Sequence, residues 1–211
     1  MRRTKPTSLA AVALFAGSCN LLTPLVFVGD HKKKILAEFD KLPNSKVAVL
    51  VWADAATLFD YPHARFELAA YVGDKLQTEL AQRKQPIELV DARDVEDFLQ
   101  KNLGARIDPQ KVGRHFDVDY MVFVEMLGFQ IRDSQQPQLL QGRLEAAVAV
   151  QDVRAEGGRG QRFDLVSVRV VYPHESPVLM SASNSQLVRE SAYRKFAEEV
   201  ARKFYDYTVD L

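Results

Sequence analysis

The chain has 211 residues, and its 28 lysines and arginines balance 28 aspartates and glutamates, so its formal charge is zero. This balance gives no indication of the basic surface that nucleic-acid binding requires, while 47% apolar and 27% charged residues are typical of a globular protein. A single cysteine excludes a disulfide framework and a thiolate metal cluster, and the length suits one domain with its own core.

The N-terminal segment follows the order of a secretory signal. A basic start precedes a short apolar run over residues 8–15, and small residues then lead into Cys19. This order resembles the bacterial lipoprotein signal, in which such a cysteine is acylated and becomes the mature N-terminus, although Ala16 stands where that signal prefers leucine. The resemblance implies a lipoprotein signal peptide over residues 1–18 and lipidation of Cys19.

Two alternatives to lipidation remain open. In the first, Cys19 is a buried free thiol, and in the second, residues 8–28 form an uncleaved membrane helix. Several acyl chains on one cysteine would hold the protein firmly at a membrane, because each buried CH₂ contributes about 0.8 kcal/mol. Asn20 follows the cysteine where inner-membrane lipoproteins usually carry aspartate, so the resemblance implies a lipid-anchored protein on the periplasmic side of the outer membrane.

Residues 19–45 are expected to form a tether that contains a short amphipathic helix. The apolar side chains Ile35, Leu36, Phe39 and Leu42 form one helical stripe within residues 32–42. Three lysines precede this stripe. They suit contact with anionic head groups, or alternatively a solvated helix end.

Residues 46–211 are expected to form a single α/β domain. Residues 46–52 are continuously apolar and rich in β-branched side chains, which is typical of a strand covered on both faces. A loop is expected over residues 53–60, followed by a helix from Pro62 to about Arg83.

Two further helices are predicted from their starting residues. A short strand over residues 86–90 precedes Asp91, which caps one helix with Asp94 in a capping-box position. Asp108-Pro109 opens another short helix by the cap-then-proline signal. Strands and helices that alternate in this way predict parallel strands.

The second half of the domain reads as an antiparallel meander. A long strand over residues 120–131 ends with Leu127, Phe129 and Ile131 on one face. Two alternating strands follow, one around residues 144–151 and one in which Val166, Val168, Val170 and Tyr172 share a face. Residues 173–185 are expected to be irregular, and a last helix spans residues 190–207. The predicted fold is therefore α/β, a mixed sheet of about five strands in the order β-α-β-α-β-β-β-α with helices packed on it.

This order of elements resembles a superfamily of bacterial envelope lipoprotein domains. Its members include the curli secretion channel subunit, the penicillin-binding-protein activator lipoprotein and the exopolysaccharide-export lipoprotein. The segments that carry the likeness are Val47-Ala48-Val49-Leu50, the helix with Leu68 to Leu80, Glu88 to Arg93, Phe116 to Val122 and Val148 to Val153. The resemblance implies action by contact and brings no catalytic residue.

The sequence contains few residues at the spacings typical of catalytic or metal-binding motifs. His31, His63, His115 and His174 stand in four separate segments without an H-E-x-x-H pattern, so no metal site is expected. The Asp117-x-Asp119 pair is expected to form hydrogen bonds within a turn rather than a cation site. No Gly-x-Ser-x-Gly motif occurs, and no cofactor is expected.

One loop is predicted to bind a partner. Ligands of open α/β sheets gather outside the carboxyl ends of the strands, and Trp52, Asp54, Phe59 and Tyr61 follow the first strand there. Exposed aromatic side chains are frequent interface anchors; alternatively, these residues cover the edge of the core.

The sequence thus favours a non-catalytic, membrane-anchored envelope lipoprotein. It would bind a protein partner and regulate or scaffold it in an export or cell-wall assembly. The alternative is a ligand-sensing or enzymatic domain that uses the crevice at the strand ends, and homo-oligomerisation is a further possibility.

Overall fold

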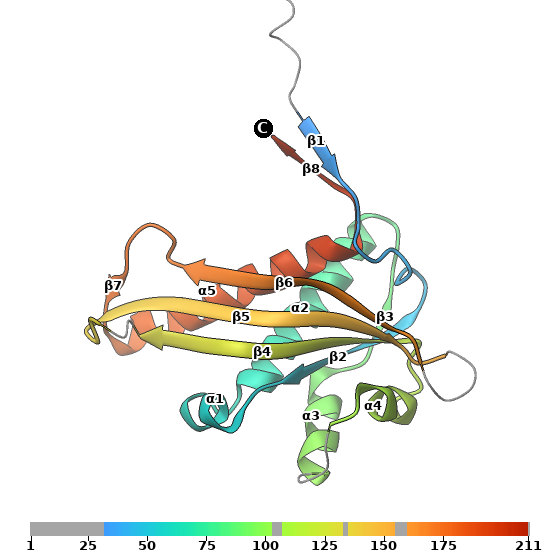
Figure 1. Cartoon of the computed structure of the whole chain (residues 1–211), viewed down its shortest axis with the longest axis horizontal. Coiled ribbons are helices and arrows are strands. Elements are labelled where there is room, and N and C mark those ends of the chain that lie inside the picture. The colour runs from blue at the N-terminus through green and yellow to red at the C-terminus, as the bar shows by residue number, and fades with distance from the viewer. Residues whose placement is uncertain (1–31, 103–106, 133–134, 155–159, 211) are drawn as a thin grey trace, which may run out of the picture. The chain divides into compact units, whose positions relative to one another are not determined.

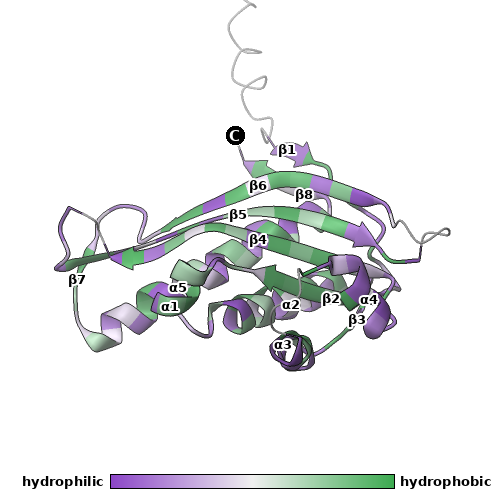
Figure 2. Ribbon diagram, turned by 60° about the horizontal axis from the view of Figure 1, so that its bottom comes forward, coloured by the Kyte–Doolittle hydropathy of each residue, from purple (hydrophilic) through white to green (hydrophobic). Residues whose placement is uncertain are grey.

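The apolar strand β2 (Lys46–Trp52) lies inside a mixed sheet, as its sequence predicts. Its five central residues are buried because helices cover both of its faces. β3 (Glu88–Leu89) and β4 (Tyr120–Arg132) flank β2 and run parallel to it. In Figure 2, β2 is green along most of its length, which marks it as the apolar centre of the parallel half.

The rest of the sheet is antiparallel. β5 (Leu139–Asp152) pairs with β4, and β6 (Arg162–Tyr172) pairs with β5. The strand order is β3-β2-β4-β5-β6, and the short β7 (Val178–Leu179) also pairs with β5. The α/β class and the mixed sheet are confirmed. The sheet has six strands rather than about five.

Two pairs of helices cover the two faces of the sheet. α2 (Ala64–Gln82) and α5 (Ala182–Ala201) lie side by side over one face, where they enclose the larger core (Figure 1). α3 (Ala92–Lys101) and α4 (Pro109–His115) cover the other face over β2, β4 and the end of β5. The helices that the structure describes include none that is both long and apolar enough to cross a bilayer.

The helix starts that the sequence predicts are observed. The side chain of Asp91 accepts a hydrogen bond from the N–H of Arg93 at 2.8 Å, and Asp108 caps α4 through the N–H of Gln110 at 3.0 Å. These bonds satisfy N–H groups that have no partner within the helix.

The structure describes residues 32–210 except for 103–106, 133–134 and 155–159. Residues 35–207 form one compact unit, which therefore begins before the predicted domain start at residue 46. The strands β1 (Lys32–Ile35) and β8 (Tyr207–Asp210) pair in a separate two-stranded sheet. Cys19 and the predicted signal peptide lie outside the described residues.

The predicted helix over residues 32–42 is wrong. These residues form β1 and then an irregular segment, because the N–H groups of Glu38 and Phe39 bond to the carbonyl of Lys203 rather than to a preceding turn. Phe39 and Leu42 are buried, whereas Leu36 is 67% exposed, which a single helical stripe does not explain. The C-terminal part of this segment therefore packs on the core through Phe39 and Leu42.

Two other boundaries differ from the prediction. Residues expected to form a loop contain a short helix, α1 (Ala55–Asp60), because Asp54 caps it. The last helix, α5, begins at Ala182 and ends at Ala201, followed by a 3₁₀ turn over Arg202–Phe204. The Ser181 hydroxyl accepts a hydrogen bond from the N–H of Asn184 and sets this earlier start.

Two β-bulges reverse the predicted side-chain alternation. One extra residue in β4 between Met126 and Gly128 leaves Leu127 59% exposed, while Phe129 and Ile131 are buried as expected. A second bulge lies in β6, opposite Ala146 to Val148, and leaves Val166 67% exposed. A bulge adds one residue to one strand and so exchanges its inner and outer faces. The N–H of Val166 bonds instead to Oε2 of Glu38 at 2.8 Å.

Candidate functional site

A groove of about 1040 Å³ opens at the carboxyl end of β2, between the sheet, α3 and α4. Aromatic side chains from three elements line it: Trp52 from β2, Phe98 from α3 and Phe123 from β4. The sequence predicted a binding site at this end of the strand, and Trp52 is the residue common to that prediction and the observed groove.

Strand register brings the sheet side of the groove together. Trp52 lies opposite Glu125, and Leu50 lies opposite Phe123, in the parallel pairing of β2 with β4. Paired residues project from the same face, as do residues two apart along one strand. Trp52, Phe123 and Glu125 therefore share the face toward α3 and α4, and all three line the groove.

The helix side of the groove is held by a largely buried ion pair. Nη2 of Arg65, in α2, lies 2.8 Å from Oε1 of Glu96, in α3, and the two side chains are 13% and 14% exposed. Phe98 packs against His115 of α4 with ring centroids 4.3 Å apart. These contacts hold α3 against α2 and α4 and so position Phe98 in the groove.

The charged lining residues differ in their partners. Arg162 lies over the Phe123 ring, with its guanidinium carbon 5.6 Å from the centroid, and pairs with Asp164 at 2.7 Å. Glu125 is half-buried and Lys111 is exposed, and neither forms a hydrogen bond or ion pair with another described residue. The groove thus combines aromatic surface with one half-buried carboxylate for which the described part of the chain provides no counter-ion.

The four residues predicted to bind a partner do not form one cluster. Trp52 faces the groove, whereas Tyr61 packs on the opposite core against Phe129, with ring centroids 4.6 Å apart. The Tyr61 hydroxyl accepts a hydrogen bond from the N–H of Ile131, and burial raises the pKa of Tyr61. Its contacts are those of a structural residue.

Of the other two residues, Asp54 caps α1 and Phe59 lies within it. Hydrogen bonds from Thr57 hold the pKa of Asp54 below its usual value, in keeping with a helix cap. Phe59 is 86% exposed at the end of the same helix. A partner-binding role for these residues stays a prediction, and lipidation of Cys19 lies outside the described residues.

The sequence interpretation missed Phe98, Phe123 and Glu125 as site residues. Phe98 and Phe123 read as ordinary core positions of a helix and a strand. Glu125 could have been recognised from the sequence, because it is a charged residue within the otherwise apolar stretch of residues 120–127. Only the register with β2 shows that this carboxylate lies beside Trp52.

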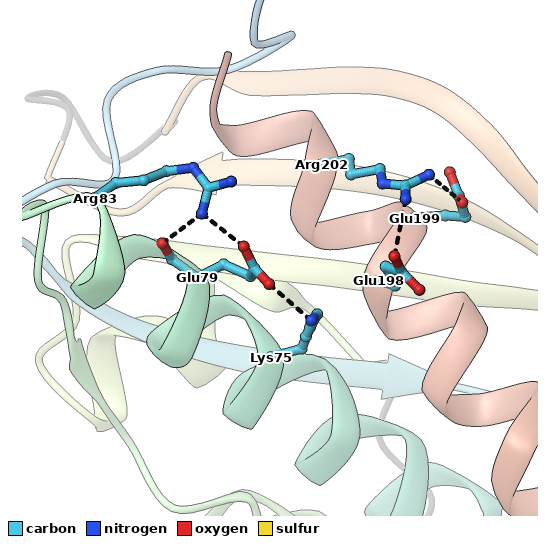
Figure 3. Close-up of polar contacts among 6 residues, drawn as sticks. All are labelled: Lys75, Glu79, Arg83, Glu198, Glu199 and Arg202. Atoms are coloured by element: carbon cyan, nitrogen blue, oxygen red, sulfur yellow. Dashed lines mark hydrogen bonds and ion pairs between the residues drawn. The ribbon is translucent and has the colours of Figure 1, made fainter. Parts of the chain in front are cut away.

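A second group of charged residues lies on the helices of the other face (Figure 3). The carboxylate of Glu79 bonds to Lys75 at 2.7 Å and to Arg83 at 2.6 Å, and the hydrogen bond from Lys75 contributes most to lowering the pKa of Glu79. Arg202 bonds to Glu198 and Glu199 in the same way. These pairs join residues three or four apart in sequence at the C-terminal ends of α2 and α5, so they stabilise those ends locally and leave little charge for a ligand.

No three histidine, cysteine, aspartate or glutamate side chains of the described residues gather in a way that would hold a metal ion. Asp117 and Asp119 serve local structure. Asp117 takes a positive φ of 51° after α4, and Asp119 accepts hydrogen bonds from the N–H of Lys46 at 2.7 Å and from Arg154.

Comparisons with known proteins find distant structural likenesses. No protein-family model and no curated protein sequence matches the chain. The PelC dodecamer subunit of Paraburkholderia phytofirmans is 9% identical, with a TM-score of 0.40, over 82% of this chain and 98% of that chain. Lipoprotein GNA1162 of Neisseria meningitidis is 14% identical (TM-score 0.36, covering 74% and 99%). A minor lipoprotein of Acinetobacter baumannii is 11% identical (TM-score 0.29, covering 75% and 89%).

Proposed function

We propose that this chain is a non-catalytic, lipid-anchored protein of the bacterial envelope that binds a protein partner through the groove beside Trp52. The proposal joins two observations. The first is the N-terminal order of basic, apolar and small residues before Cys19. The second is the groove itself. By the residue that follows the cysteine, the destination is the outer membrane, and the partner belongs to an export or cell-wall assembly.

The composition of the groove carries the binding part of the proposal. Its described lining contains aromatic, aliphatic, basic and acidic side chains, but no serine, threonine, cysteine, histidine or tyrosine. The described lining thus lacks the hydroxyl, thiol and imidazole groups that many enzymes use as nucleophile or base, whereas aromatic and arginine side chains are enriched in protein interfaces. The lining therefore favours recognition over reaction.

Photo-crosslinking in cells tests partner binding at this site. Benzoylphenylalanine replaces Phe98 in the groove and Phe59 on α1, and replaces Leu187, exposed on α5, as the matched control. We expect one protein cross-linked through Phe98 and none through Leu187. The position at Phe59 tests whether the partner also reaches α1. Cross-links between copies of this chain would indicate a homo-oligomer instead.

The anchor is tested separately with Cys19→Ala. We expect mass spectrometry of the native protein to find an acylated N-terminal cysteine, and we expect the variant to lose the membrane fraction together with its cross-linked partner. An intact, unmodified segment over residues 1–18 on the native protein would contradict the anchor. No cross-link at Phe98, combined with stabilisation by a small molecule, would favour the ligand-sensing alternative.

A further inference from the structure

Glu125 is a half-buried carboxylate that has no partner among the residues the structure describes. It lies on β4 opposite Trp52 of β2, and both side chains line the groove. Among the described residues, no hydrogen bond or ion pair reaches it. Partial burial of a carboxylate is unfavourable unless a donor or a cation compensates it, so this position is suited to a positively charged guest.

The aromatic lining favours the same guest. Trp52, Phe98 and Phe123 line the groove around Glu125, and the faces of aromatic rings attract cations, most strongly the indole of tryptophan. The Phe123 ring already has the guanidinium of Arg162 at 5.6 Å. One ring of the groove therefore already contacts a planar cation, which belongs to the chain itself.

The other charges of the lining do not cancel this preference. Arg65 is neutralised by Glu96, and Arg162 by Asp164. Asp108 is occupied as the cap of α4. The two remaining charges are Glu125, half-buried on the sheet, and Lys111, exposed on α4. Among the described lining residues, the charge that is withdrawn from solvent and has no partner is thus the negative one.

We propose that the groove receives an arginine side chain of the partner protein, with its guanidinium between the carboxylate of Glu125 and the indole of Trp52. Arginine fits better than lysine because its planar fork bonds both oxygens of a carboxylate and stacks on aromatic faces. This inference rests on the proposed function, since it names the group by which the partner is recognised.

Trp52 is the only tryptophan of the chain, so its fluorescence reports directly on the groove. The full chain in neutral detergent is titrated with the peptide acetyl-Gly-Arg-Gly-amide, and with the same peptide carrying citrulline or lysine in place of arginine. We expect a saturable change with arginine, a weaker one with lysine and none with citrulline, which has nearly the same shape but no charge.

Two variants localise the effect. Glu125→Gln should weaken arginine binding about tenfold, because it removes a charge-assisted hydrogen bond. The matched control, Glu88→Gln, neutralises an exposed strand carboxylate outside the groove and should change nothing. Far-ultraviolet circular dichroism and urea midpoints equal to those of the parent chain show that both variants are folded.

Equal responses to arginine and citrulline would overturn the proposal, as would tighter binding of lysine or an arginine affinity that Glu125→Gln leaves unchanged. The experiments also distinguish failure of this inference from failure of the proposed function. A protein cross-linked at Phe98 while the arginine peptide fails would reject only the arginine. Binding of the peptide without any cross-linked protein would reject the protein partner.

Discussion

The ammonium nitrogen of Lys203 lies 2.8 Å from Oε1 of Glu38, although 165 residues separate the two in sequence. The carbonyl of Lys203 also accepts the N–H of Glu38 at 2.8 Å. The segment that leads into the sheet is therefore bonded to the end of the last helical turn through both backbone and side chains.

The Glu38→Gln variant should lose more stability than Lys203→Met. The Lys203 side chain is only 9% exposed, against 33% for Glu38, so loss of the carboxylate leaves a buried cation without its counter-ion. We expect Glu38→Gln to lower the free energy of unfolding by about 2 kcal/mol and Lys203→Met by less than about 1 kcal/mol. Urea denaturation measures both, and equal losses would show that the pair is not effectively buried.

Asp119→Asn should change how stability depends on pH. Burial tends to raise the pKa of Asp119, but the hydrogen bonds from Arg154 and from the backbone of Lys46 outweigh it and lower the pKa below 3.8. A lowered folded pKa stabilises the protein above the ordinary carboxyl range, and this contribution is lost as the pH falls through the folded value.

We therefore expect the Asp119→Asn variant to be about 1 kcal/mol less stable than the parent at pH 7. The difference should shrink as the pH falls below the ordinary value of 3.8. Urea midpoints measured from pH 7 down to acid conditions follow this difference. A gap that stayed constant down to the lowest pH would contradict the argument.

Gly113→Ala should destabilise the packing of α4. A Cβ atom at this buried position would lie 2.5 Å from Cγ2 of Val153, too close for an unstrained contact. We expect a loss of about 2 kcal/mol in the free energy of unfolding. Gly128→Ala is the matched control, because its Cβ would meet nothing within 4 Å, and it should leave stability unchanged or slightly raised.

Tyr193→Phe should be tolerated. The Tyr193 hydroxyl is buried and has no hydrogen-bond partner among the described residues, and burial raises its pKa far above the usual value. Removing an unsatisfied polar group is neutral or stabilising by up to about 1 kcal/mol. Tyr61→Phe removes a hydroxyl that accepts the N–H of Ile131 and should cost about 1 kcal/mol. A larger loss for Tyr193→Phe in urea denaturation would mean that its hydroxyl is satisfied in solution.

Local chemistry allowed much of the fold to be predicted. β2 is continuously apolar because it is buried on both faces, and Asp91 and Asp108 bond to the N–H groups of the helices that they precede. Each of these signals lies within a few residues of the element that it predicts.

The wrong predictions depend on contacts distant in sequence. Residues 32–42 have an apolar spacing that suits a helix, but Lys203 provides the carbonyl to which their N–H groups bond. The bulges at Leu127 and Val166 depend on pairing with β5; Gly128 next to the first is a residue type that suggests a bulge, whereas no glycine or proline stands within β6. Periodicity alone does not reveal such contacts.

The candidate site was predicted only in part for the same reason. Trp52 was recognised from its position at the end of a strand, where ligands gather. The location of Glu125 beside it requires the register between β2 and β4, which a sequence does not state. Asp54, Phe59 and Tyr61 follow Trp52 closely in the chain, yet the turn into α1 carries them away from the groove.

The carboxylate of Glu38 also covers one backbone amide on the outermost strand of the sheet. β6 is the last strand in the order of the large sheet, and the N–H of Val166 on it is bonded to Oε2 of Glu38. An unpaired N–H group beside an exposed valine side chain on an edge strand can pair with a strand of another molecule. A side chain from the segment that leads into the domain therefore occupies an amide that another strand could otherwise pair with.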